Sequence, residues 1–243
     1  MPDPTNRRPR PDDDAELFVV AVDGPSGSGK SSASRGVARR LGFAYLDTGA
    51  MYRAATWLML NSDIEQDDPE LVAKLVAEAD LGVGTDPRAP IFTVNGADVT
   101  AAIREPVISA SVSKVATNLA VRRLLIERQR EIIAASRPGI VVEGRDITTV
   151  VAPDAQVRVL LVADPAARVA RRKNELGDRI LDAEVHDQVI RRDRDDSTVA
   201  RFHDAAPGVT VIDSTDLSLD QVIDRITELV TAARNDRPVG EGQ

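Results

Sequence analysis

The sequence feature that most constrains the fold is a glycine-rich motif between an apolar segment and an amphipathic one. Residues 24–31 read GPSGSGKS, which fits the pattern G-x-x-x-x-G-K-[ST] at every position. The preceding residues, 17–22, form a continuous apolar run that is typical of a buried parallel strand. The following residues, 31–41, carry apolar side chains at helical spacing. A strand, a glycine-rich loop and a helix in this order predict an α/β fold that binds a nucleoside triphosphate.

The residue types of this loop indicate how it would hold the triphosphate. Glycines let backbone N–H groups curl around the β-phosphate, and the N-terminus of the following helix adds favourable partial charge. Lys30 is expected to bridge the β- and γ-phosphates, and the Ser31 hydroxyl to bind the Mg²⁺ that accompanies ATP. The alternative, a Gly/Ser-rich turn that fits by accident, is disfavoured by the flanking strand and helix. The expected ATP-binding residues are Gly24, Pro25, Ser26, Gly27, Ser28, Gly29, Lys30, Ser31 and Ser32.

Strand-like and helix-like segments alternate along most of the chain. Further buried strands are expected at residues 139–143, 157–163 and 209–213, and helices at 64–78, 118–135, 164–174, 183–196 and 218–233. Such alternation predicts a parallel, doubly wound sheet flanked by helices. Residues 80–105 interrupt this alternation of strands and helices, because apolar and polar residues alternate there and a turn is expected at Asn95–Gly96. This pattern predicts a small β-rich insertion that contains a hairpin.

Composition excludes several classes of protein. Hydrophobic residues make up 42% and charged residues 29%, as in soluble globular proteins, and no apolar run approaches the roughly 20 residues that span a bilayer. The N-terminus has no apolar stretch after its basic residues, so no secretory signal is expected. The lack of Cys excludes disulfides and thiolate zinc sites, and a cytoplasmic location is expected. The net charge of −8 argues against general binding to nucleic acid or to anionic membranes.

Positive charge comes mostly from Arg, and two stretches are dense in it. Arg168, Arg171 and Arg172 have the i, i+3 and i+4 spacing of one helix face, and Arg192 and Asp196 are four residues apart. An acidic protein that handles phosphates has to gather Arg locally, so these stretches are candidates for phosphate binding. The alternative is an ordinary charged helix hairpin with Arg–Asp pairs, which contribute little to stability.

The order of several longer motifs resembles that of bacterial cytidylate kinases. GPSGSGKSS, LDTGAMYR, GADVTAAIR, SASVSKVA, VVEGRDITTVVAPDA, ARVARR and RRDRDDST follow one another between about residues 17 and 233. The first motif is shared by many families, whereas LDTGAMYR and VVEGRDITTVVAPDA are much more specific. The resemblance implies a P-loop fold with a central parallel sheet, a β-rich insertion for the acceptor and a helical lid. It also implies ATP-dependent phosphorylation of CMP and dCMP by a monomer, with Mg²⁺ brought by ATP.

The resemblance implies a domain organisation as well. A single kinase domain is expected at residues 17–233, with disordered tails at 1–16 and 234–243. Its core would comprise residues 17–62, 106–172 and 192–233, the insertion that binds the nucleoside monophosphate about 63–105, and the lid about 173–191.

Individual residues outside the glycine-rich loop also acquire roles by resemblance. Thr48 and Arg53 would contact the acceptor phosphate, and Arg145 would bind phosphate near the site of phosphoryl transfer. Ser113 would read the cytosine edge, and Arg122 with Asp146 would complete the base and sugar sites. The expected CMP-binding residues are Thr48, Arg53, Ser113, Arg122, Arg145, Asp146 and Asp196. The expected catalytic residues are Lys30, Arg145, Arg168 and Arg192, and replacing one of these Arg by Ala should lower turnover far more than thermal stability.

Each of these assignments has a structural alternative. Taken alone, residues 46–53 describe a turn with a Thr cap that leads into a helix. Ser113 has the alternative of capping a helix that begins near Asn118, and Arg122 that of lying on a solvated helix face. The charged triplet of residues 143–146 follows an apolar strand, and such a triplet at the carboxyl end of a strand favours a functional role over solvent-facing charge.

The sequence departs from the family pattern in the lid. The motif R-D-x-x-D-S-x-R has Val199 at its last position, with Arg201 two residues later. Either Arg201 replaces the missing contact, or the affinity for CMP is lower. Residues 202–208 lack the usual Pro-Leu, and Glu143 stands where some members carry Asp.

Two other functions compete with CMP phosphorylation. The first is a P-loop kinase with another small acceptor, such as UMP, AMP or a sugar acid. The second is a non-catalytic nucleotide-dependent switch, but the sequence has no N-K-x-D segment of the kind that guanine-nucleotide switches carry.

Overall fold

The fold is built on a five-stranded parallel sheet. A computed structural model of the chain describes residues 16–176, 193–195, 197–200 and 204–236. The strand order is β2-β6-β1-β7-β8, and all neighbouring pairs run parallel. The strands are β1 Phe18–Asp23, β2 Ala44–Asp47, β6 Gly139–Gly144, β7 Val157–Val162 and β8 Thr210–Asp213. The predicted parallel sheet is confirmed, and the four strands expected by residue range lie within one residue of their predicted bounds.

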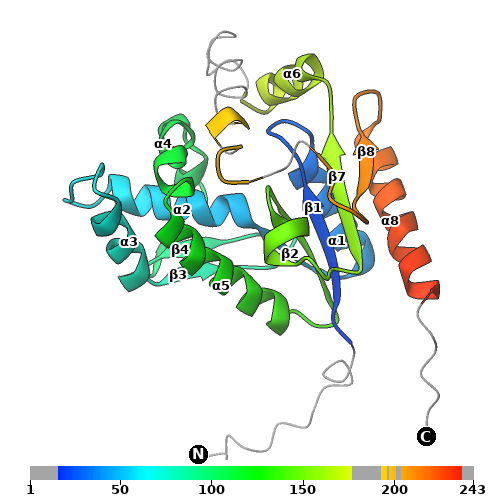
Figure 1. The fold of residues 1–243 in the computed structure, drawn as a ribbon, viewed down its shortest axis with the longest axis horizontal. Coiled ribbons are helices and arrows are strands. Elements are labelled where there is room, and N and C mark those ends of the chain that lie inside the picture. The colour runs from blue at the N-terminus through cyan, green and yellow to red at the C-terminus, as the bar shows by residue number, and fades with distance from the viewer. Residues whose placement is uncertain (1–15, 177–192, 196, 201–203, 237–243) are drawn as a thin grey trace, which may run out of the picture.

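The central strands are apolar throughout because both faces of the sheet are covered. Every residue of β1 and β6 is buried, and their side chains alternate between two cores. One core contains Val19 and Ala21 and packs against α2, α4 and α5. The other contains Val20 and Val22 and packs against α1 and α8. Figure 1 shows these helices on opposite sides of the sheet.

The helices largely match the periodic segments of the sequence. Their bounds are α1 Lys30–Leu41, α2 Thr48–Leu60, α3 Pro69–Glu78, α4 Pro106–Ala116, α5 Leu119–Ala135, α6 Pro165–Leu176 and α8 Leu219–Asn235. Helix α3 begins five residues later than the predicted residue 64, because Asp68 caps it and Pro69 occupies its first turn. Helix α8 begins with a capping box of Ser218 and Gln221. None of the described helices is long and apolar enough to cross a membrane.

The β-rich insertion is confirmed as a three-stranded antiparallel sheet. It consists of β3 Leu81–Val83, β4 Phe92–Val94 and β5 Ala97–Asp98. Asn95 and Gly96 link β4 and β5 with φ angles of 50° and 82°, as a tight hairpin requires. Phe92 and Val94 pack in one cluster with Ala50, Ala54 and Leu58 of α2, so the insertion is anchored to the helix that follows β2.

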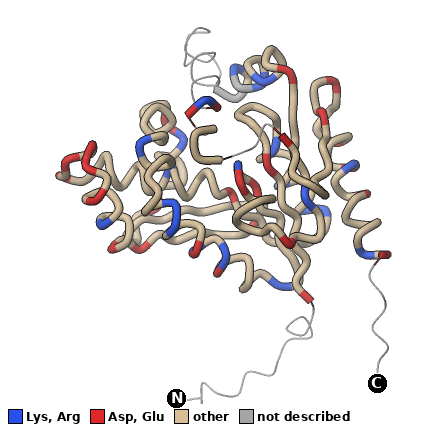
Figure 2. Tube along the Cα trace, viewed as in Figure 1, with Lys and Arg blue, Asp and Glu red and all other residues tan. Residues whose placement is uncertain are grey.

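Three helical segments were missing from the sequence-based prediction. Helix α4 lies between the 3₁₀ turn η1 (Ala102–Arg104) and α5, and a π-helical turn, η2 (Ile147–Val151), follows β6. The expected helix at 183–196 and most of the expected lid and tails lie outside the described residues. Acidic and basic residues are interspersed over the fold (Figure 2).

Candidate active site

A pocket opens at the carboxyl ends of β1, β2 and β6. This edge is where ligands bind in parallel α/β sheets. The pocket is shared by the glycine-rich loop, the N-terminal half of α2, α4, α5 and the segment after β6. Of the residues predicted to act, it brings together Ser26, Gly27, Gly29, Lys30, Ser31, Ser32, Thr48, Arg53, Arg122, Arg145 and Asp146. Gly24, Pro25, Ser28, Ser113 and Arg168 do not line it, and Arg192 and Asp196 lie outside the described residues.

The glycine-rich loop has a conformation that its glycines make possible. Gly27 has a φ of 76°, and a Cβ there would lie 2.6 Å from the Arg168 carbonyl oxygen. The loop then enters α1 at Lys30. The Lys30 ammonium donates to the Pro25 carbonyl at 3.3 Å and lies 4.0 Å from Glu143 Oε2. Both the loop and the amino group therefore face the pocket where a triphosphate would bind.

Ser31 is held by a buried carboxylate. Its hydroxyl donates to Glu143 Oε1 at 2.6 Å, and the Tyr45 hydroxyl donates to the same oxygen at 3.1 Å. Burial, reinforced by the negative charge of Asp47, raises the pKa of Glu143. Burial likewise raises the pKa of Tyr45, so its hydroxyl keeps its proton and remains a donor.

These oxygen ligands suit Mg²⁺. The ion prefers hard oxygen donors and is usually bound by one or two protein groups together with phosphate and water. The Ser31 hydroxyl and the Glu143 carboxylate are such groups, and they meet beside the glycine-rich loop. No cluster of three or more His, Cys, Asp or Glu in the described part of the chain could hold a metal by itself.

The segment after β2 carries the expected phosphate contacts. Asp47, and not Thr48, caps α2, because its carboxylate accepts from the Ala50 N–H at 2.8 Å. The Thr48 hydroxyl instead donates to the Glu143 carbonyl at 2.8 Å. Arg53 donates to Asp47 at 3.0 Å. Burial would raise the pKa of Asp47, but Arg53 and the Ala50 N–H outweigh it and hold this pKa below its ordinary value.

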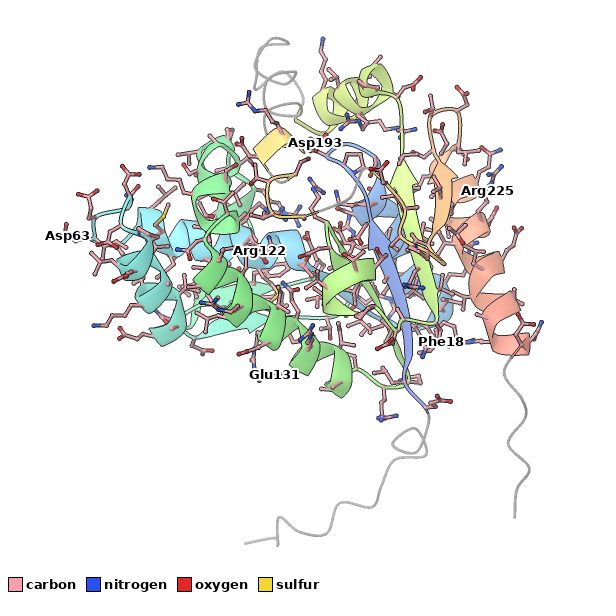
Figure 3. All side chains as sticks on the ribbon, viewed as in Figure 1. Phe18, Asp63, Arg122, Glu131, Asp193 and Arg225 are labelled. Carbon is pink, nitrogen blue, oxygen red and sulfur yellow. The ribbon has the colours of Figure 1, made fainter. Side chains whose placement is uncertain are left out.

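Arg122 points into the pocket, so its alternative as a solvated residue is wrong. It forms an ion pair with Asp146, and both side chains are about nine-tenths buried. It also donates to the Ala116 carbonyl at 3.2 Å and lies over the Tyr52 ring at 5.9 Å. The pair joins α5 to the segment after β6, and Figure 3 labels Arg122.

The two described candidate catalytic Arg residues differ in their environments. Arg145 lines the pocket and donates to the Gly24 carbonyl at 2.7 Å. Arg168 is buried beneath the loop, where it donates to the Ser26 carbonyl at 3.1 Å and forms an ion pair with Asp193. Asp193 accepts from the Ser26 N–H at 2.9 Å and lies 3.9 Å from Arg145. A single carboxylate thus links the loop to both Arg side chains.

Ser113 lies within α4, so its alternative as the cap of the next helix is wrong. Asn118 performs that role, and its side chain accepts from the Ala120 and Val121 N–H groups. The Ser113 hydroxyl donates to Asp195 at 3.0 Å. Val199, the departure from the family pattern, lines the pocket. Arg201, its possible substitute, lies outside the described residues.

Comparisons with known proteins agree with this geometry. The family model described as cytidylate kinase matches residues 20–232. The chain belongs to the cytidylate kinase family. It is 56% identical to a cytidylate kinase of Cutibacterium acnes over 214 residues, which is 88% of this chain and 96% of that relative. It is 46% identical to a cytidylate kinase of Nocardia farcinica, over 88% of this chain and 93% of that relative.

Likeness to solved structures is weaker. A shikimate kinase from Acinetobacter baumannii, crystallised with shikimate, aligns over 91% of this chain and 95% of that chain. The TM-score is 0.43 and the identity 12%, so nothing further is drawn from this alignment. The resemblance to cytidylate kinases and the P-loop fold are both confirmed, the first by the family match and the second by the sheet and its loop.

For this member of the cytidylate kinase family, the sequence did not indicate the partners of three carboxylates that organise the site. Glu143 belongs to the charged triplet for which a functional role was expected, but its hydrogen bond with Ser31 was not predicted. Asp193 and Asp195 connect the segment after α6 to the loop and to α4. The RRDRDD stretch, with three Arg and three Asp, indicates a charged segment but does not identify the partners of Asp193 and Asp195.

Proposed function

We propose that the pocket at the sheet edge is the active site in which this chain transfers the γ-phosphoryl group of ATP to CMP and dCMP. Cytidylate kinase family membership supports this reaction and disfavours UMP, AMP or a sugar acid as the main acceptor. The observation that carries the assignment is the shared pocket. It contains Lys30 and Ser31 of the glycine-rich loop together with Arg53 and the Arg122–Asp146 pair.

The donor is ATP, and the residues of the loop would hold its phosphates. Backbone N–H groups and the N-terminus of α1 would bind the β-phosphate, while Lys30 would bridge toward the γ-phosphate. Mg²⁺ would be held through Ser31 with Glu143 behind it, and it would neutralise charge on the phosphate oxygens. Glu143 and Tyr45 fix the orientation of the Ser31 hydroxyl before the nucleotide arrives.

On the acceptor side, we assign the monophosphate to Arg53 and Thr48 and the nucleoside to the wall formed by α4 and α5. Arg53 is fixed by Asp47, and a guanidinium can bind two phosphate oxygens at once. Val112 and Ala116 of α4, together with Tyr52 of α2, give the pocket an apolar surface on which a flat base can lie. Arg122 and Asp146 supply the polar groups for the base and sugar.

Transfer would then depend on positioning and on positive charge. The moving phosphoryl group carries charge over its oxygens, and Arg145 lines the pocket between the two halves. Arg168 would contribute from beneath the loop through Asp193, and Arg192 and Asp196 remain expectations from the sequence. We also propose a monomer in the cytoplasm, where ATP and CMP are available.

The decisive test is ADP production with ATP, Mg²⁺ and each nucleoside monophosphate in turn. The fastest turnover is expected with CMP and dCMP. Faster transfer to UMP or AMP would contradict the proposed acceptor while leaving the donor site intact. Turnover without any added protein also excludes a non-catalytic switch.

A further inference from the structure

The π-helical turn η2 (Ile147–Val151) begins with backbone N–H groups that its own N-cap residue does not bind. Asp146 occupies the N-cap position, but its side chain makes no capping hydrogen bond. The first N–H groups of a helical turn have no partner within the turn, and an Asp at this position ordinarily accepts from them. Ile147 and Thr148 are both buried, so their N–H groups need a partner inside the protein.

That partner is Asp23, the last residue of β1. One of its carboxylate oxygens accepts from the Ile147 N–H at 2.9 Å. The other accepts from the Thr148 N–H at 2.8 Å and from the Thr148 hydroxyl at 2.7 Å. Asp23 is 1% exposed, so it acts inside the protein and does not touch a nucleotide. Three hydrogen bonds fix its carboxylate in one orientation.

Capping from another strand changes what Asp146 can do. Because Asp23 occupies the N–H groups of η2, the Asp146 carboxylate pairs with Arg122 instead, and both residues line the pocket. If Asp146 turned back to cap its own helix, as N-cap Asp residues do, Arg122 would lose this partner. The orientation of the acceptor-side pair therefore depends on a residue of the donor-side strand.

The same end of β1 makes a second link. Gly24, the next residue, accepts a hydrogen bond from Arg145 through its carbonyl oxygen. Two consecutive residues, Asp23 and Gly24, thus bind three residues of the segment after β6, namely Arg145, Ile147 and Thr148. The register of the strands supports this, because Asp23 pairs with Gly144 directly before that segment.

We propose that Asp23 is a positioning residue for the acceptor half of the site: by capping η2 from β1, it holds Asp146 in the orientation that pairs with Arg122 and faces the nucleoside monophosphate. The proposal deepens the proposed function and rests on its acceptor site. Misplacing a substrate-binding group by about 1 Å can cost about 100-fold in rate, so the loss of this cap should be measurable.

A double-mutant cycle tests the proposal. We would measure kcat/KM for CMP in the wild type, Asp23→Asn, Asp146→Ala and the double variant. Asn keeps the size of Asp but offers one acceptor oxygen in place of two. Asp23→Asn is expected to lower kcat/KM by about 10- to 100-fold. In the Asp146→Ala background the same change should cost less than about threefold, because the group that Asp23 positions is already gone.

Two further variants separate positioning from a general loss of stability. Thr148→Val removes only the hydroxyl bond to Asp23 and should produce a smaller loss in kcat/KM, of about fivefold. Thr227→Val removes a comparable hydroxyl bond in α8, to the Ile223 carbonyl, and should lower Tm without changing kcat/KM. Affinity for ATP, measured with a fluorescent analogue, should change less than affinity for CMP in every variant.

The outcomes that would overturn the proposal are distinct from failure of the proposed function. Additive losses in the cycle, or a lower Tm with unchanged kcat/KM, would show a purely structural role for Asp23. If the wild type fails to phosphorylate CMP, the proposed function is wrong, and a crystal structure of Asp23→Asn still decides the positioning. In that structure the Asp146 carboxylate should have turned from Arg122 to the N–H groups of η2; an unchanged pair would overturn the proposal.

Discussion

The proposed donor and acceptor halves of the pocket are built in different ways. The donor half is one continuous segment, residues 24–32, whose binding groups are mainly backbone N–H groups and the end of α1. The acceptor half draws side chains from α2, α5 and the segment after β6. Local chain conformation therefore sets the shape of the donor half, whereas the acceptor half depends on how distant elements pack.

The difference indicates where substitutions should act. Changing a donor-side group removes one interaction with the phosphates and leaves the scaffold in place. On the acceptor side, Arg53 is held by Asp47 and Arg122 by Asp146. Substituting the carboxylate partner of one of these Arg residues should weaken substrate binding, even where the carboxylate itself does not contact the substrate. The predictions below test this contrast.

The largest effect is expected from Lys30→Ala on the donor side. Loss of the amino group removes positive charge from the β- and γ-phosphates, where cationic groups contribute about 10³-fold or more to turnover. Affinity for CMP should change little, because the Arg53 and Arg122 pairs are unaffected. Coupled ADP production and calorimetric CMP binding would measure the two effects. A loss in kcat below about tenfold would contradict the assigned role of Lys30.

Arg145→Ala and Arg168→Ala should have different effects on stability, although the sequence predicts both residues to be catalytic. Arg145→Ala is expected to lower kcat by about 10²- to 10³-fold with little change in Tm, because Arg145 lines the pocket. Arg168→Ala should also destabilise the protein, by about 3 kcal/mol, because it removes the closer of the two Arg partners of the buried Asp193 and leaves only Arg145, at 3.9 Å. Thermal unfolding, measured together with the kinetics of both variants, would show this difference in stability. Equal stability of the two variants would contradict the distinction.

The donor half was predictable because its signals are contiguous. The apolar run before residue 24 and the helical spacing after residue 31 sufficed to place β1, the loop and α1 within one residue. Helix α4 was missed because its buried residues, Ile108, Val112 and Val115, are separated by Ser and Ala that give little contrast. Its start at Pro106 was the available signal.

The carboxylates that organise the site could not be predicted for a different reason. Asp23 bonds to residues 124 and 125 positions away, and Asp193 bonds to Ser26 across 167 positions. No local pattern in a single sequence identifies such a pair. The resemblance to cytidylate kinases supplied the residues that would contact substrate, but the groups that hold those residues required the fold.

Val199→Arg should strengthen the acceptor half. Val199 lines the pocket where the family pattern has Arg, so a guanidinium there would add a contact to the acceptor. The KM for CMP is expected to fall by about tenfold, which corresponds to about 1.4 kcal/mol, with the KM for ATP unchanged. Val199→Leu is the matched control, because it adds volume without charge. An unchanged or higher KM for CMP in the Arg variant would favour compensation by another residue, with Arg201 the first to replace by Ala.

The smallest effect is expected from Asp47→Asn, which removes the charge that pairs with Arg53 but keeps an oxygen to cap α2. The free energy of unfolding should fall by about 1 kcal/mol at pH 7. Because the folded pKa of Asp47 lies below its ordinary value of 3.8, the charge stabilises the fold above that pH, and this contribution is lost as pH falls through the folded pKa. Urea unfolding of the wild type and Asp47→Asn should therefore be compared between pH 7 and pH 3. The difference in their free energies of unfolding should stay the same over most of this range and shrink only at its acidic end. A difference that shrank already between pH 7 and pH 5 would show that some other group carries the stabilisation, and Arg53 would then be held by the shape of α2 more than by its partner's charge.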